Sequence, residues 1–101
     1  MADGSIPNGP TYFACRWEHE SPDDPVVLYE EIGADRMEIR KVHEYQDGRL
    51  VRSDRVSDSK DGLSWAPVPP LDEIDADPAF SVTSLTSAEF DAVWTRAVDA
   101  E

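Results

Sequence analysis

Apolar and polar residues alternate along the first half of the chain with the period of two that is typical of β-strands. Residues 11–19 predict the first strand, in which every second side chain is apolar: Phe13, Cys15 and Trp17 fall on one side and Tyr12 on the other. The segment Ser21–Pro25 holds two prolines and two aspartates. Such a composition predicts a turn after this strand.

Three further strands are predicted, at Val26–Ile32, Arg36–Tyr45 and Arg49–Val56. In the third strand the alternation shifts by one residue partway along. Met37 and Ile39 fall on one side of the strand, but Val42 falls on the other. We therefore expect a β-bulge near Arg40-Lys41. Asp47-Gly48 is a strong hairpin signal, and the fourth strand is polar enough to lie at an edge of the sheet.

The period of the pattern changes in the second half of the chain. A proline-rich connection over 57–70 leads to a short helical turn at Leu71–Asp77. Thr86 and Glu89 fit a capping box, and the following apolar residues recur at helical spacing, which predicts a helix over Ser87–Ala100.

These elements predict an α+β domain, a four-stranded antiparallel meander with the C-terminal helix packed on one face. Residues 1–10 read as a flexible tail and residues 11–101 as a single domain. Because one helix covers one face, we expect the other face to be partly open. An apolar pocket is expected there, near Tyr12, Tyr29 and Trp65.

The net charge of −13 changes this picture, because it is unevenly placed. Residues 1–35 carry eight acids and one base, residues 36–60 five acids and seven bases, and residues 61–101 nine acids and one base. Nucleic acid and anionic membrane are disfavoured as partners, since both require basic surfaces. The segregated charge favours a basic protein partner over a uniform solubility coat.

Residues that could carry chemistry are few. The chain has two histidines, His19 and His43, and a single cysteine, Cys15, which excludes an internal disulfide. Neither histidine can easily pair with the glutamate beside it in a strand, and no metal-ligand motif is present. We expect no catalytic site, no metal and no cofactor. The N-terminus has no signal-peptide pattern, so a cytoplasmic protein is expected.

The acidic residues are the one group of side chains in the sequence that suggests a function. A meander could gather the carboxylates of the second turn at one pole of the sheet, joined by those of the 71–77 turn. The predicted partner-binding residues are Tyr29, Glu30, Glu31, Asp35, Trp65, Asp72, Glu73 and Asp75, with Asp58, Asp61 and Asp77 nearby. The rival pole is the first turn, with Glu18, Glu20, Asp23 and Asp24.

Three stretches together resemble a known family. They contain Trp17-Glu18-His19, then Arg36-Met37-Glu38-Ile39, then Glu89-Phe90-Asp91-Ala92-Val93-Trp94. Their order and spacing over Thr11 to Ala97 are similar to those of a family of small, poorly characterised acidic bacterial proteins. The extreme acidity also resembles the acidic streptomycete inhibitors of small secreted guanyl-specific ribonucleases. That likeness implies a cytoplasmic immunity protein, as in toxin–antitoxin pairs, which binds a secreted ribonuclease one to one.

Two functions follow as expectations. In the first, carboxylates mimic RNA phosphate and block the basic active site of a microbial ribonuclease. In the second, the domain binds a small ligand or acts as a regulatory domain through the open sheet face. The first predicts association that slows steeply with salt, whereas the second predicts binding that is indifferent to salt.

Overall fold

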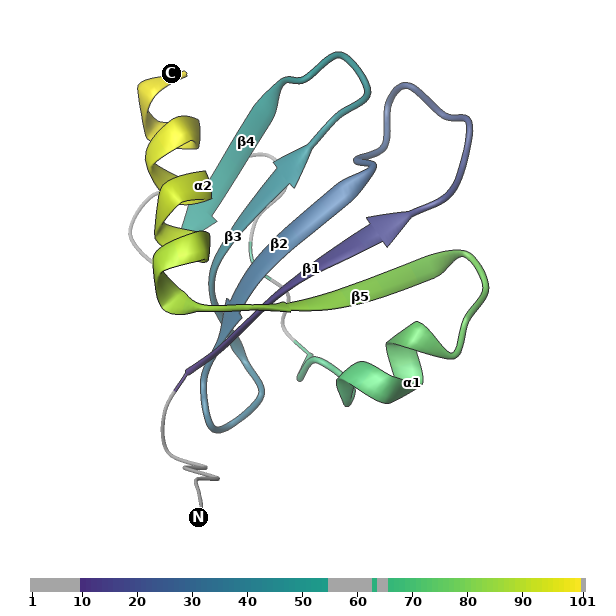
Figure 1. The fold of residues 1–101 in the computed structure, drawn as a ribbon, viewed down its shortest axis with the longest axis vertical. Coiled ribbons are helices and arrows are strands. Elements are labelled where there is room, and N and C mark those ends of the chain that lie inside the picture. The colour runs from purple at the N-terminus through teal and green to yellow at the C-terminus, as the bar shows by residue number, and fades with distance from the viewer. Residues whose placement is uncertain (1–9, 55–62, 64–65, 101) are drawn as a thin grey trace.

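The computed structural model describes residues 10–54, 63 and 66–100 (Figure 1). Five strands and two helices follow one another in the order β1 (Thr11–Trp17), β2 (Val27–Ile32), β3 (Glu38–Glu44), β4 (Leu50–Asp54), α1 (Leu71–Asp75), β5 (Phe80–Leu85) and α2 (Ser87–Asp99). Two predicted segments lie largely outside the described residues: the tail, except Pro10, and the part of the 57–70 connection before residue 66, except Leu63.

The strands form one antiparallel sheet in the order β4-β3-β2-β1-β5. The predicted α+β fold and the meander of the first four strands are confirmed, and β4 lies at an edge as expected. The sheet also has a fifth strand, β5, which pairs with β1 from Tyr12↔Leu85 to Trp17↔Phe80. The chain therefore returns across the molecule before α2 begins.

Strand β5 was missed because its pattern is short. Phe80 and Val82 alternate with polar residues, but the next residue in phase is Ser84. Two apolar positions are too few to separate an edge strand from a loop. The carboxylate of Asp75 accepts a hydrogen bond from the Val82 amide at 2.8 Å, so α1 satisfies one outward donor of this edge strand.

The two hairpin turns beside β3 each contain a residue with a left-handed backbone conformation. In the β3–β4 turn Gly48 has φ of 88° and its amide bonds to the Tyr45 carbonyl, so the Asp47-Gly48 hairpin is confirmed. In the β2–β3 turn Arg36 takes the same left-handed conformation, with φ of 69°, and its amide bonds to the Gly33 carbonyl. A side chain at positive φ is strained, so the surroundings must hold Arg36 there.

Helix α2 starts where the sequence predicts. The Thr86 hydroxyl accepts a bond from the Glu89 amide at 3.1 Å, and the Glu89 carboxylate accepts the Thr86 amide at 2.8 Å, which completes the capping box. The buried Phe90 and Ala97 face the sheet. The Phe90 ring lies 5.6 Å from that of Tyr12, so α2 packs on the side of the sheet that carries Tyr12. We call this side the Tyr12 face.

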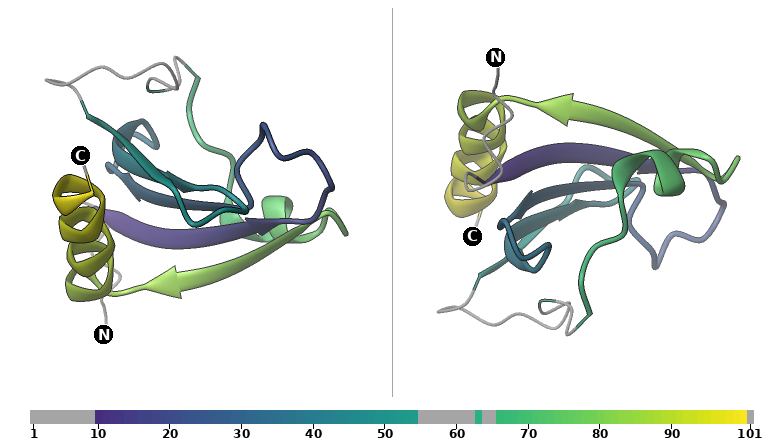
Figure 2. Two further views of the ribbon diagram at one scale, coloured as in Figure 1. Left: turned by 90° about the horizontal axis from the view of Figure 1, so that it is seen from above. Right: turned by 90° about the horizontal axis from the view of Figure 1, so that it is seen from below.

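The opposite side of the sheet, here called the Phe13 face, holds the main apolar core. Buried Phe13, Cys15 and Ile32 pack with Val68, and Leu71 and Ile74 of α1 pack against them. Figure 2 shows α2 on one side of the curved sheet and the segment before α1 on the other. The expectation placed Tyr12 and Tyr29 on the face away from the helix, and this placement is wrong, because both lie on the face against which α2 packs. That face is only partly covered, since a pocket of about 280 Å³ lined by Tyr29 opens on it.

Candidate functional site

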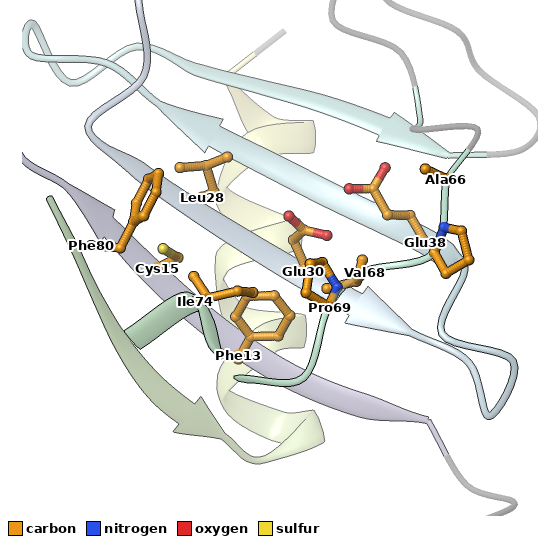
Figure 3. Close-up of a pocket in the computed structure, with 11 residues that line it drawn as sticks. Phe13, Cys15, Leu28, Glu30, Glu38, Ala66, Val68, Pro69, Ile74 and Phe80 are labelled. Carbon is orange, nitrogen blue, oxygen red and sulfur yellow. The ribbon is translucent and has the colours of Figure 1, made fainter. Parts of the chain in front are cut away.

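A pocket of about 300 Å³ opens on the Phe13 face (Figure 3). Its floor comes from β1, β2 and β3, one end from β5, and its walls from the 66–69 segment and α1. We call it the carboxyl pocket. The residues that line it are Phe13, Cys15, Leu28, Glu30, Glu38, Ala66, Pro67, Val68, Pro69, Ile74 and Phe80. All except the two glutamates carry apolar or weakly polar side chains, and a largely apolar lining with a few placed polar groups is typical of ligand sites.

A β-bulge brings the two glutamates together. Glu31 pairs with Arg40, but the next residue, Ile32, pairs with Glu38, so Ile39 is an extra residue in β3. The predicted bulge is therefore present one position earlier than Arg40-Lys41. Because side chains alternate along a strand, the extra residue turns Glu38 onto the same face as Glu30. Without it Glu38 would share the side of Arg40.

The Glu30 carboxyl is held in its neutral form. Burial, followed by a hydrogen bond with Glu38 and the negative charge of that residue, raises the pKa of Glu30 from an ordinary 4.5 to about 9, against a smaller opposing effect of Lys41. The Lys41 ammonium lies 3.7 Å from Oε1 of Glu38. The pair therefore shares one negative charge, which Lys41 stabilises on Glu38, and Glu30 keeps a proton at neutral pH.

One carboxyl oxygen of Glu30 has no hydrogen-bond donor among the described residues. Glu30 is 8% exposed, and its Oε1 receives no hydrogen bond from any residue that the structure describes. Figure 3 shows the Glu30 carboxyl between Glu38 and the apolar group of Leu28, Cys15 and Phe80. A buried acceptor without a donor costs free energy, so it marks a place where a ligand or water can bind.

The wall of the pocket is fastened by Arg36. Its backbone carbonyl accepts the Val68 amide at 2.7 Å, and its guanidinium donates to the carbonyls of Val68 and Pro69 at 3.1 and 2.5 Å. These three bonds join the turn between β2 and β3 to a segment more than 30 residues later in the chain. They explain why Arg36 tolerates its positive φ, and they hold the 66–69 wall over the sheet.

The structure separates the predicted partner-binding residues of β2. Glu30 lies in the carboxyl pocket, whereas Glu31 lies on the Tyr12 face, where it accepts bonds from Arg40 at 2.5 Å and Tyr12 at 3.1 Å. Tyr29 also lies on that face and donates to Glu44 at 2.8 Å. Burial, and then this bond to Glu44, raises the pKa of Tyr29 to about 12, so it remains a donor.

The other predicted partner-binding residues lie outside the pocket. Asp35 is exposed in the β2–β3 turn, where Oδ1 accepts the Met37 amide at 3.0 Å. Asp72, Glu73 and Asp75 are exposed on α1. Trp65, Asp58 and Asp61 lie outside the described residues. The predicted set therefore does not form one surface, and its role in binding a partner stays a prediction.

Parts of the two acidic poles predicted from the sequence lie side by side in the structure. The Glu18 amide donates to the Ala79 carbonyl at 2.8 Å, which places the turn after β1 beside the segment after α1. Residues 18–25 and 71–82 contain no lysine or arginine. Their exposed carboxylates, here called the acidic surface, are Glu18, Glu20, Asp23, Asp24, Asp72, Glu73, Asp75 and Asp77.

Of the residues that line the carboxyl pocket, the sequence pattern predicts only Glu30 as a site residue. It misses the others, including Glu38 and Phe80, and also Lys41 beside Glu38. The signal for Glu38 was the change of phase in β3, because a bulge reverses which residues share a face with Glu30. Phe80 belongs to the missed strand. His19 is placed as expected for a structural residue, since Nε2 donates to the Pro25 carbonyl at 2.7 Å and Nδ1 accepts the Ser21 amide at 3.0 Å.

Across the part of the chain that the structure describes, no three histidine, cysteine or acidic side chains lie close enough together to hold a metal ion. Neither described helix has the length and apolar character needed to cross a membrane.

Comparison with known proteins gives a family but no characterised relative. No curated protein and no solved structure matches the chain. A family described as a domain of unknown function, DUF6881, matches residues 11–99, which span all five strands and both helices. This protein, with its five-stranded sheet and its carboxyl pocket, belongs to the DUF6881 family.

Proposed function

We propose that this domain binds a small, largely apolar ligand in the carboxyl pocket. The observation that carries the proposal is the carboxyl of Glu30, which lines a largely apolar pocket and whose buried Oε1 has no donor among the described residues. A suitable ligand would place its apolar part against Phe13, Ile74 and Phe80. It would also offer a hydrogen-bond donor to the Glu30 carboxyl.

The energetic cost of the pocket supports this proposal. Glu30 and Glu38 are 8% and 7% exposed, and removing carboxyls from water costs several kcal/mol unless they are fully paired. Apolar side chains of similar size would be more favourable here if packing were the only need. For Glu30, whose Oε1 has no donor among the described residues, the cost is understandable when the carboxyl binds something that the free protein lacks.

Nuclear magnetic resonance can test the proposal with benzyl alcohol as a neutral probe. We expect amide shifts concentrated at the residues lining the carboxyl pocket. Ile74→Trp fills the pocket and should abolish these shifts. Val98→Trp, at a residue that is 41% exposed on α2, is the matched control and should leave them unchanged. Shifts scattered over the molecule, or unaffected by Ile74→Trp, would contradict the proposal.

A second candidate is that the domain is an immunity protein which inhibits a basic protein, such as a secreted guanyl-specific ribonuclease, one to one in the cytoplasm. The acidic surface favours it, because eight exposed carboxylates lie in two adjoining segments without a basic residue. Such a surface attracts a cationic cleft and speeds association. The resemblance to acidic ribonuclease inhibitors points to the same class of partner.

Inhibition and its kinetics separate this candidate from the first. Excess protein should stop RNA cleavage by a guanyl-specific ribonuclease, and the association rate should fall steeply between low and physiological salt. Asp72→Lys/Glu73→Lys should slow association, whereas Asp35→Lys, outside the acidic surface, should change it less. Undiminished RNA cleavage at stoichiometric excess would reject this partner.

A further inference from the structure

Glu30, Glu38 and Lys41 form a group of charged residues on the Phe13 face. Among the described residues, Glu30 and Glu38 lie beside the buried ammonium of Lys41, which is 3.7 Å from Glu38. With both carboxyls ionised, these three groups would carry a net charge of −1. In the free protein the proton on Glu30 removes that charge. A cation bound at Glu30 could balance the charge in the same way as this proton.

The other titratable and charged groups near the pocket come from several neighbouring elements. The β1 thiol of Cys15 has a raised pKa, first because of burial and then because of the charges of Glu30 on β2 and Asp75 on α1. Buried His43 lies on β3 two residues from Lys41, on the same face of the strand. The guanidinium of Arg36 is directed to the carbonyls of the pocket wall. Lys41 is the base that acts on Glu30.

We infer that the ligand of the carboxyl pocket carries a cationic amine, which binds Glu30 through its ammonium group and takes the place of the proton there. The inference rests on the proposed ligand-binding function. An ammonium supplies the donor that Oε1 of Glu30 lacks and also the missing positive charge. The net charge of −13 further favours a cation over an anion or a neutral group.

Binding is then an exchange of charge at Glu30. The ammonium form of the ligand enters with its own protons, the Glu30 carboxyl ionises, and its proton leaves for the solvent. One proton is therefore released for each ligand bound, as long as Glu30 is protonated in the free protein. Affinity should rise with pH by up to about tenfold per unit until Glu30 ionises without a ligand.

Benzylamine and benzyl alcohol form a matched pair of probes, because they differ in charge but hardly in shape. Calorimetry at pH 7 in buffers of different ionisation enthalpy should show release of close to one proton with benzylamine and none with benzyl alcohol. Benzylamine affinity should rise at least tenfold from pH 6 to pH 8, while that of benzyl alcohol stays within twofold.

Two variants complete the test. Glu30→Gln should abolish proton release and weaken benzylamine binding at least tenfold, whereas benzyl alcohol binding should weaken by a smaller factor, because the Gln side chain still offers a carbonyl acceptor. Glu31→Gln, on the Tyr12 face, is the control and should keep the wild-type proton release. If benzyl alcohol binds in the pocket and benzylamine binds without proton release, the amine inference is overturned and the ligand-binding proposal stands. If neither probe reaches the pocket, both are overturned.

Discussion

The side chain of Glu30 joins stability and binding in one group. Its carboxyl is 8% exposed, is bonded to Glu38 and has one oxygen without a donor among the described residues. A neighbouring residue, Glu31, has the same chemistry and similar burial, but it is paired with Arg40 on the other face. The pKa of Glu30 is raised first by burial and then by the hydrogen bond with Glu38 and the charge of that residue.

Replacing Glu30 should make stability less dependent on pH. Its pKa is raised to about 9 in the folded protein, so between about pH 4.5 and pH 9 the native state holds a proton that the unfolded state has lost. This group therefore destabilises the fold progressively as pH rises through that window. The free energy of unfolding of Glu30→Gln, minus that of the wild type, should increase by up to about 1.4 kcal/mol per pH unit.

Urea unfolding at pH 5.5, 7 and 8.5 measures this difference. Glu20→Gln, at an exposed position in the first turn, is the control and should show a difference that hardly changes with pH. A constant offset between Glu30→Gln and the wild type over the same range would mean that Glu30 titrates as an ordinary carboxyl.

The hairpin of β2 and β3 builds the carboxyl pocket through two irregularities. The bulge at Ile39 turns Glu38 toward Glu30, and the turn residue Arg36 holds the 66–69 wall. An ideal hairpin would present neither feature. Bulges and strained turn residues are therefore used here to direct side chains, as they often are near functional sites.

Substitutions at Arg36 separate backbone strain from the bonds of its side chain. Arg36→Ala loses the guanidinium bonds but keeps a residue with a Cβ at positive φ, whereas Arg36→Gly loses the bonds and relieves the strain. We expect Arg36→Gly to unfold at a higher urea concentration than Arg36→Ala, with a difference of about 1 kcal/mol. Equal stability of the two variants would show that the turn carries no such strain.

The molecule as a unit carries far more negative than positive charge, and the charge is arranged by the fold. Three basic residues from the middle of the sequence, Arg40, Lys41 and Arg52, lie on β3 and β4. The Arg40 guanidinium bonds Glu31 and Asp91 and lies 5.0 Å from the centre of the Trp94 ring. The two acidic flanks instead meet along the turn after β1 and around α1. Repulsion within the acidic surface opposes folding.

Added salt should therefore stabilise the protein. Screening weakens repulsion between exposed carboxylates more than it weakens the partly buried pair of Arg40 and Glu31. We expect Tm to rise by roughly 5 °C from 10 to 500 mM sodium chloride, the shift that about 1 kcal/mol produces in a domain of this size. Asp23→Asn/Asp24→Asn should show a smaller rise. A Tm that falls with salt would mean that ion pairs outweigh repulsion.

Local patterns were enough for most of the elements. The first four strands, the Asp47-Gly48 hairpin, the bulge in β3 and the capped helix α2 follow from alternation, turn chemistry and capping, which act between residues a few positions apart. The extreme acidity and its concentration in the two flanks are likewise properties of the chain.

The carboxyl pocket depends on contacts between residues far apart in sequence. The pairing of β5 with β1, the packing of α2 against Tyr12 and the bonds from Arg36 to the 66–69 wall all join distant segments. The meeting of Glu30 and Glu38 depends on strand register, in which a shift of one residue reverses the face of a side chain. Neither the raised pKa of Glu30 nor the pocket around it exists until those segments pack together.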